Sequence, residues 1–159
     1  FAVGFGLGVV AALMRRYGPR PLRLLVRFYV WVIRGTPLLV QLFLIFYALP
    51  GIGITLDAFP AAVIGFTLNV GAFTSEVIRA TLLSVAKGQW EAAHSIGMNW
   101  WQSLRHIILP QAAWVAVPPL SNTFISLVYD TSLSSVLTVP ELFLAAQKIV
   151  AVTYQPLIL

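Results

Sequence analysis

Long uncharged apolar runs alternate with short polar stretches along this chain of 159 residues. A helix needs roughly 20 consecutive apolar residues to cross the hydrocarbon of a bilayer. Runs that reach or approach this length recur along the chain, and a more polar segment ends it. The expected membrane segments are residues 1–14 (the C-terminal part of a span), 35–56, 58–75, 107–129 and 135–159. The pattern therefore predicts an all-α integral membrane protein with about five transmembrane helices.

Several residues inside or beside these runs indicate how the helices begin, end and pack. Gly4 and Gly8 stand four apart, which fits close helix packing in lipid. Glu76 and Arg79 interrupt the third run, and because they are three apart on one helix face, we expect them to pair. The fourth run contains Pro110, Pro118 and Pro119, which predicts a kinked span. The fifth run is interrupted by Pro140, Glu141, Lys148 and Pro156.

The composition supports a membrane protein. Residues of the set AVILMFWYC make up 59% of the chain and charged residues 9%, whereas about 25% of the residues of an ordinary soluble domain are charged. So few charges are too few to cover a soluble surface. The chain has no cysteine, which excludes disulfides and thiolate metal sites.

The net charge of +5 is concentrated in two regions. Six arginines without an acid lie between the first two apolar runs: Arg15, Arg16, Arg20, Arg23, Arg27 and Arg34. We expect Gly18, Pro19 and Pro21 to break any helix here and leave a loop. In a soluble protein such a patch would suggest nucleic-acid binding, but between apolar runs the positive-inside rule makes it a cytoplasmic loop. Nine of the ten basic residues lie in or beside this loop and the segment of residues 84–110, so both are expected in the cytoplasm and no nucleic acid is expected as a partner.

Residues 88–112, GQWEAAHSIGMNWWQSLRHIILPQA, form the longest segment that is not lipid-soluble. Residues 91 to about 98 indicate a short helix, and Gly97 is the expected point where the chain turns out of it. Trp101 and Leu104 then recur at helical spacing. Two interpretations follow from the residues alone: two short cytoplasmic helices that meet at a glycine, or an amphipathic helix lying on the inner leaflet.

The order Glu91-Ala92-Ala93, Gly97 after three further residues, and then Ile107, Leu109 and Pro110 resembles the EAA loop of the permease subunits of ATP-binding-cassette importers. Three other segments resemble the polar amino acid branch of that superfamily: RGTPLLVQLF (34–43), GAFTSEVIRA (71–80) and YDTSLSSVLTVPEL (129–142). The resemblance covers nearly the whole chain. It implies the type I importer permease fold (MetI-like): a single transmembrane domain over residues 1–159 with a cytoplasmic coupling loop at about residues 84–110. Since the chain begins at Phe1 and ends within an apolar run, we expect this domain to be truncated at both ends.

The resemblance also implies roles for particular residues. Glu91, Ala92, Ala93 and Gly97 correspond to the residues through which the family's first short helix couples to an ATPase subunit. Leu104 stands where the family often has phenylalanine. The implied partners are two ATP-binding-cassette ATPase subunits, a second permease chain, either identical or similar, and an extracytoplasmic amino-acid-binding protein, at a bacterial inner membrane. The chain has no GxxxxGK[ST] phosphate loop, so the ATPase is expected on another polypeptide.

No catalytic or metal-binding constellation is evident. The two histidines, His94 and His106, lie twelve residues apart without a nearby acid pattern, and no GxSxG elbow occurs. We therefore expect neither an enzyme nor a cofactor. The alternative function is a self-sufficient secondary transporter or channel, in which Glu76, Asp130 and Lys148 would serve ion coupling. A purely structural membrane anchor would leave the EAA spacing unexplained.

Two residues are candidates for the substrate path. Asp130 follows the fourth run and is expected near its outer end, where it either meets the amino group of the substrate or caps the helix by accepting from the amides of Thr131 or Ser132. Asn69 lies about 16 Å along the third span, near mid-membrane, and offers neutral contacts. Tyr129 stands where the resembling family commonly has lysine, which leaves charge recognition at the outer mouth open.

Overall fold

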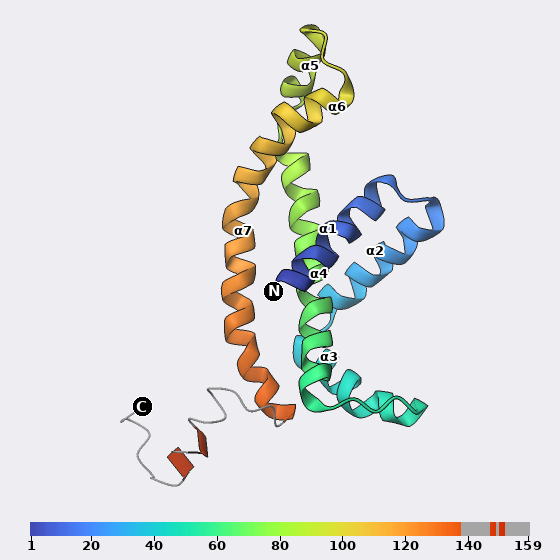
Figure 1. The fold of residues 1–159 in the computed structure, drawn as a ribbon, viewed down its shortest axis with the longest axis vertical. Coiled ribbons are helices and arrows are strands. Elements are labelled where there is room, and N and C mark those ends of the chain that lie inside the picture. Colours follow the sequence, from blue (N-terminus) through green and yellow to red (C-terminus); the bar gives the residue numbers. More distant parts are fainter. Residues whose placement is uncertain (138–146, 149, 152–159) are drawn as a thin grey trace.

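A computed structural model describes residues 1–137, 147–148 and 150–151 of the chain (Figure 1). The described residues fold into helices, and no strand occurs among them. In chain order they are α1 (Ala2–Tyr17), α2 (Arg20–Gly35), α3 (Leu38–Phe43), η1 (Leu44–Ala48), η2 (Leu49–Ile52), α4 (Ala58–Ser84), α5 (Lys87–Ser95), α6 (Trp100–Ser103), η3 (Leu104–Ile108), α7 (Leu109–Asp130) and η4 (Thr131–Leu137). The all-α architecture predicted from the sequence is confirmed, whereas most of the expected fifth span, residues 138–159, lies outside the described residues apart from a few positions.

The two longest apolar helices, α4 and α7, run antiparallel side by side, with α5 and α6 at one end of the pair (Figure 1). By length and composition, α4 and the continuous helix Trp100–Ser134 are each able to cross a membrane. A third crossing is added if α2 and the segment Leu38–Ile52, which meet at an angle of 111°, count as one bent span.

Helix α1 packs along α4 at two glycines. A Cβ atom built on Gly4 would lie 2.8 Å from the Cβ of Val70, and one built on Gly8 would lie 2.5 Å from the Cβ of Thr74. Both distances are shorter than real carbon atoms tolerate, so only glycine permits this backbone approach. The close packing expected from the Gly4/Gly8 spacing is confirmed.

The arginine-rich segment differs from its prediction. Instead of a loop, Gly18 and Pro19 form a brief break between α1 and α2, and four of the six arginines lie on α2. Pro21 sits in the first turn of α2, where a helix does not need its missing N–H. Glycine and proline predict a break in a helix, but Pro19 and Pro21 stand where α2 begins, and proline is compatible with that position.

The second predicted span, residues 35–56, is also not one straight helix. Helix α2 ends at Gly35, Pro37 caps α3, and the uncharged run continues only to Ile52 as α3, η1 and η2. Gly53 follows with a φ of 85°, the left-handed conformation that favours glycine. The chain therefore turns out of the apolar run at Gly53.

Helix α4 continues for eight residues beyond Glu76, so Glu76 and Arg79 do not interrupt it as the sequence suggested. Their expected pairing is confirmed, because Nε of Arg79 donates to Oε1 of Glu76 at 2.8 Å. The sequence did not indicate a second partner: Nη1 of Arg15, on α1, donates to Oε2 of Glu76 at 2.7 Å. Glu76 thus ties the C-terminal part of α1 to α4.

Candidate functional site

Helix α5 carries the EAA sequence and ends in a Schellman motif at Gly97. The amide of Gly97 donates to the carbonyl of His94 at 3.0 Å, and the amide of Met98 donates to that of Ala93 at 3.1 Å. This 5→2 and 6→1 pair satisfies the last carbonyls of a helix and requires a left-handed residue. Gly97 adopts that conformation with a φ of 81°. The predicted turn at Gly97 is confirmed.

The chain re-enters a helix immediately after this turn. Asn99 caps α6 in a capping box: its side chain accepts from the amide of Gln102 at 2.9 Å, and the Gln102 side chain accepts from the amide of Asn99 at 2.9 Å. Helix α6 then continues through the π-helical turn η3 into α7. The second short helix expected from the sequence is therefore the first part of the long helix Trp100–Ser134.

Pro110 follows the π turn directly. The amide of Leu109 donates to the carbonyl of Leu104, an i→i+5 bond. This wider turn accommodates a proline ring that would clash with the carbonyl four residues earlier in an α-helix. The helix therefore continues from α6 into α7 without a break.

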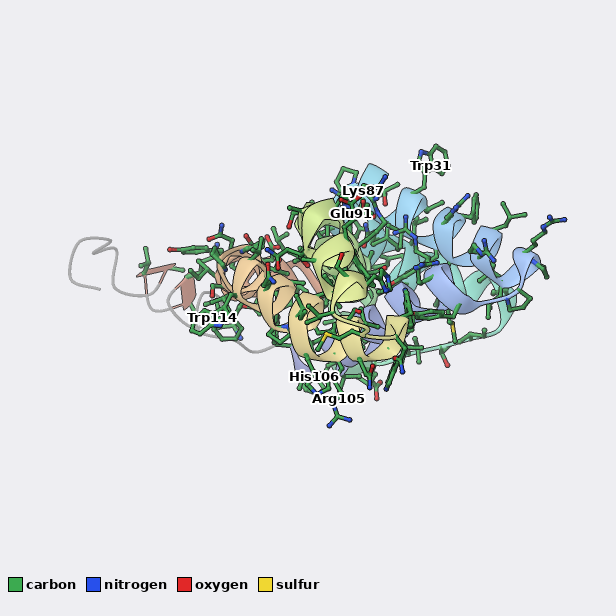
Figure 2. The ribbon with its side chains drawn as sticks, turned by 90° about the horizontal axis from the view of Figure 1, so that it is seen from above. Trp31, Lys87, Glu91, Arg105, His106 and Trp114 are labelled. Carbon is green, nitrogen blue, oxygen red and sulfur yellow. The ribbon has the colours of Figure 1, made fainter. Side chains whose placement is uncertain are left out.

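The four residues expected to couple the chain to an ATPase differ in their burial on α5 and in the turn that follows it. Ala93 is fully buried against the segment that follows Gly97, whereas Glu91, Ala92 and Gly97 are exposed. In Figure 2, seen from above the α5 end, Lys87 and Glu91 project from one edge and Arg105 and His106 from the opposite edge. The small side chain of Ala93 permits the close packing, and Glu91 is left available at the surface.

An aromatic cluster joins α5 to α1. The ring of Trp100 stacks on that of Trp90 at a centroid distance of 6.2 Å and meets that of Tyr17 edge-on at 6.2 Å. Tyr17 is the last residue of α1, and Trp90 lies on α5. Trp100 therefore contacts both elements, a role that its position in the sequence did not reveal.

Asn69 belongs to a polar network at the bend between α2 and α3. Its Nδ2 donates to Oε1 of Gln41 at 3.4 Å. Nε2 of Gln41 in turn donates to the carbonyl of Ile33 at 2.7 Å and to the carbonyl and Oγ1 of Thr36, each at 3.0 Å. Gln41 is 6% exposed. Like Trp100, Gln41 was not identified from the sequence. A glutamine inside an uncharged apolar run could have indicated a polar contact within the membrane.

Asp130 is the last residue of α7, at the end of the α4–α7 pair remote from α5 (Figure 1). The expected cap at Thr131 is not formed, because the amide of Thr131 donates to the carbonyls of Leu127 and Tyr129 within the helix. Within the described residues, the Asp130 carboxylate makes no hydrogen bond or ion pair, and it does not contact Asn69. The candidate path residues are therefore separate from each other and from the α5 element.

Comparison with known proteins identifies the class to which this arrangement belongs. The family model described as "Binding-protein-dependent transport system inner membrane component" matches residues 4–158. Since the match covers nearly the whole chain, the chain belongs to this family of membrane-embedded transport components.

Among the proteins that the chain resembles are permease proteins named for particular amino acids. The chain is 58% identical over 149 residues to the L-cystine transport system permease protein TcyB of Bacillus subtilis (strain 168), covering 94% of this chain and 64% of that protein. It is 37% identical over 158 residues to the glutamine transport system permease protein GlnP of Escherichia coli (strain K12), covering 98% and 72%. A solved structure, "Crystal structure of an amino acid ABC transporter with histidines", superposes with a TM-score of 0.90 at 38% identity, covering 98% of this chain and 73% of that chain. The chain thus spans less than two thirds of the length of the cystine permease.

Proposed function

We propose that the chain is the membrane-spanning permease part of an ATP-driven importer of polar amino acids. The family description, which names a binding-protein-dependent system, and the relatives named for cystine and glutamine support this function. The partners are two ATPase subunits, a second permease chain and an extracytoplasmic amino-acid-binding protein. The chain itself is not an enzyme, and ATP is hydrolysed on the ATPase partner.

The observation that carries the proposal is the construction of α5. A short helix with an exposed Glu91 is held by a buried Ala93 and a Schellman turn at the end of two apolar helices (Figure 1). Such an element presents its outer face to a partner while its inner face fixes it to α7. ATP binding closes the ATPase pair, the docked α5 follows, and the permease exchanges its inward-facing and outward-facing arrangements.

The arginine distribution supports a cytoplasmic α5 at the inner membrane, since basic residues gather at that end of the spans. Asp130, at the other end of α7, then lies at the outer mouth, where its carboxylate, which pairs with no described residue, suits the ammonium group of an incoming amino acid. Asn69 is a path residue by virtue of its polar side chain near mid-membrane. The alternative of a self-sufficient ion-coupled transporter is weakened by Glu76, whose carboxylate is already held by Arg15 and by an arginine of its own helix.

The coupling proposal is tested by Glu91→Lys and Gly97→Asp in the complete transporter. Glu91→Lys reverses the charge at the docking surface, and no described residue pairs with its carboxylate, so the fold is preserved. Gly97→Asp places a side chain at a φ of 81°, which costs about 1 kcal/mol in the turn. We expect both variants to insert in the membrane, to lose uptake, and either to bind the ATPase less tightly or to uncouple hydrolysis from substrate.

Gly88→Asp is the matched control. Gly88 lies on α5 and is exposed, and a Cβ at Gly88, as at Gly97, meets nothing within 4 Å. The two glycines differ in φ, which is positive only at Gly97. The control should retain most uptake. Normal uptake in both Glu91→Lys and Gly97→Asp contradicts the coupling role and favours a helix that merely lies on the inner leaflet.

A further inference from the structure

An open cavity of about 370 Å³ lies among α1, α2 and α4. Its volume is within the range of small-molecule sites, about 300–1,000 Å³. The charged residues that line it are Arg15, Arg27, Arg34 and Glu76, and Trp31 stands at its edge. Three arginines against one glutamate leave it with a net charge of +2, so the cavity suits an anion.

Two of the three arginines keep unused donors. The Glu76 carboxylate is already paired with Arg15 and with a second arginine of α4. The guanidinium of Arg34 lies over the ring of Phe73, with Cζ 5.3 Å from the centroid. In the described part of the chain, neither Arg27 nor Arg34 forms an ion pair or hydrogen bond. Guanidinium groups bind phosphate through paired charge-assisted N–H donors, and these two are available for it.

The surface beside the cavity is apolar. Leu24, Leu25 and Phe28, on the exposed part of α2, are each about two thirds exposed, and Trp31 is 73% exposed. Figure 2 shows Trp31 projecting outward from α2, away from the other helices. A helix that combines arginines with exposed leucine, phenylalanine and tryptophan is typical of the membrane interface.

The depth of the cavity agrees with that environment. Glu76 lies 18 residues after Ala58, or about 27 Å along α4, close to the roughly 30 Å thickness of the hydrocarbon core. With the C-terminal end of α4 facing the cytoplasm, as the proposed orientation has it, the cavity opens at the level of the inner-leaflet head groups. That leaflet is where anionic lipids attract basic residues.

We propose that this cavity binds the phosphate of an anionic phospholipid from the cytoplasmic leaflet. Arg27 and Arg34 donate to the phosphate oxygens, Arg15 adds positive charge while it holds Glu76, and Trp31 packs along the upper part of the lipid. A free phosphate ion offers the same oxygens, but it makes no use of the apolar face of α2. The lipid therefore joins α2 to the α1–α4 pair at the side that faces the bilayer.

The test compares lipid retention by the complete transporter in nanodiscs of phosphatidylcholine and phosphatidylglycerol, followed by native mass spectrometry. Arg27→Gln together with Arg34→Gln should lower the apparent affinity for phosphatidylglycerol about 30-fold, because the donors of two guanidinium groups to the phosphate are lost. The matched control is Arg16→Gln together with Arg20→Gln, which removes the same charge from exposed arginines outside the cavity. It should change retention by only a few fold. Lysine at both positions 27 and 34 keeps the charge but loses the paired donors, so it should bind more weakly than the native protein and more tightly than the glutamine pair. It provides the comparison if the glutamine pair destabilises the protein.

Three outcomes overturn the proposal. An equal loss in both glutamine pairs shows a diffuse surface attraction instead of a site. Displacement of phosphatidylglycerol by excess inorganic phosphate assigns the cavity to a soluble anion. Unchanged retention in the variants at 27 and 34 shows that lipid does not occupy the cavity. Because lipid retention is measured without transport, these outcomes are independent of the coupling test at Glu91 and Gly97.

Discussion

Replacing Gln41 with leucine removes the side chain that connects α2, α3 and α4 at the 111° bend. The amide nitrogen of Gln41 has three acceptors on the α2 side of the bend, and its oxygen accepts from Asn69 on α4. Leucine fills a similar volume without polar atoms, so the change tests the hydrogen bonds with little effect on packing. We expect the variant to be less stable and the angle between α2 and α3 to be less well defined.

The loss of stability expected for Gln41→Leu depends mainly on the carbonyl of Ile33. In a continuing helix it would accept from the amide of residue 37, but that residue is Pro37 and has no N–H. Gln41 therefore supplies a donor that the backbone cannot replace, at 2.7 Å. An orphaned acceptor of this kind costs about 1–3 kcal/mol, whereas hydrogen bonds measured inside membrane proteins average about 0.6 kcal/mol. Because Oγ1 of Thr36 still donates to a carbonyl of α2 at 2.9 Å, we expect a loss of about 2 kcal/mol for Gln41→Leu, mostly from Ile33.

The assay is reversible unfolding in mixed micelles with increasing sodium dodecyl sulfate, followed by circular dichroism. Gln111→Leu is the matched control, since Gln111 is exposed and its amide makes one side-chain hydrogen bond, to Gln89 at 3.2 Å. It should lose less than about 0.5 kcal/mol, as surface substitutions usually do. Asn69→Ala should fall between the two, because its bond to Gln41 is long at 3.4 Å. If Gln41→Leu is no more destabilising than Gln111→Leu, the bend is not held by this network.

Two further predictions follow from the proposed orientation and path. Single cysteines at Gly88 and Gly53 should react with membrane-impermeant reagents from opposite sides, Gly88 from the cytoplasm; labelling of Gly88 from outside intact cells refutes the topology and the coupling proposal with it. Asp130→Asn keeps the shape of the side chain and removes its charge, so ATPase activity should persist while uptake falls. Apparent substrate affinity should weaken about 10- to 150-fold, which corresponds to about 1.5–3 kcal/mol for a hydrogen bond to a charged group. Uptake that is unchanged across substrate concentrations assigns Asp130 a structural role.

Local signals in the sequence were sufficient for several features. The left-handed turn at Gly97 and the Glu76–Arg79 pair depend on residues a few positions apart, and the glycines at 4 and 8 indicated close packing of α1 without indicating that α4 is its partner. Glycine at a helix end, opposite charges three apart and glycines four apart have the same physical meaning in most helical proteins. The sequence pattern therefore carried them without knowledge of the tertiary structure.

Features that depend on distant residues were missed. The second partner of Glu76 is Arg15, 61 positions away, and no local pattern indicates it. The sequence predicts a span over residues 35–56 but not the bend at Pro37, because the bend is held by Gln41 and by Asn69 from another helix. Proline within a helix usually breaks it, so Pro21 predicts a loop in the arginine-rich segment. Proline in the first turn is compatible with a helix, and Pro21 lies in the first turn of α2.

The same long-range contacts explain how α5 can act on the membrane helices. One route runs from Gly97 through the helix Trp100–Ser134, in which α6, the π turn and α7 follow one another without a break. A second route runs from Trp100 to Tyr17 at the end of α1, and α1 is fixed to α4 by the Arg15–Glu76 pair. With the proposed docking of α5 on an ATPase, a displacement of α5 therefore moves α7 directly, and it reaches α4 both through the two residues that connect α4 to α5 and through α1. Since α4 and α7 lie side by side, a displacement that reaches each of them from α5 changes their relative position, which is the change that alternating access requires.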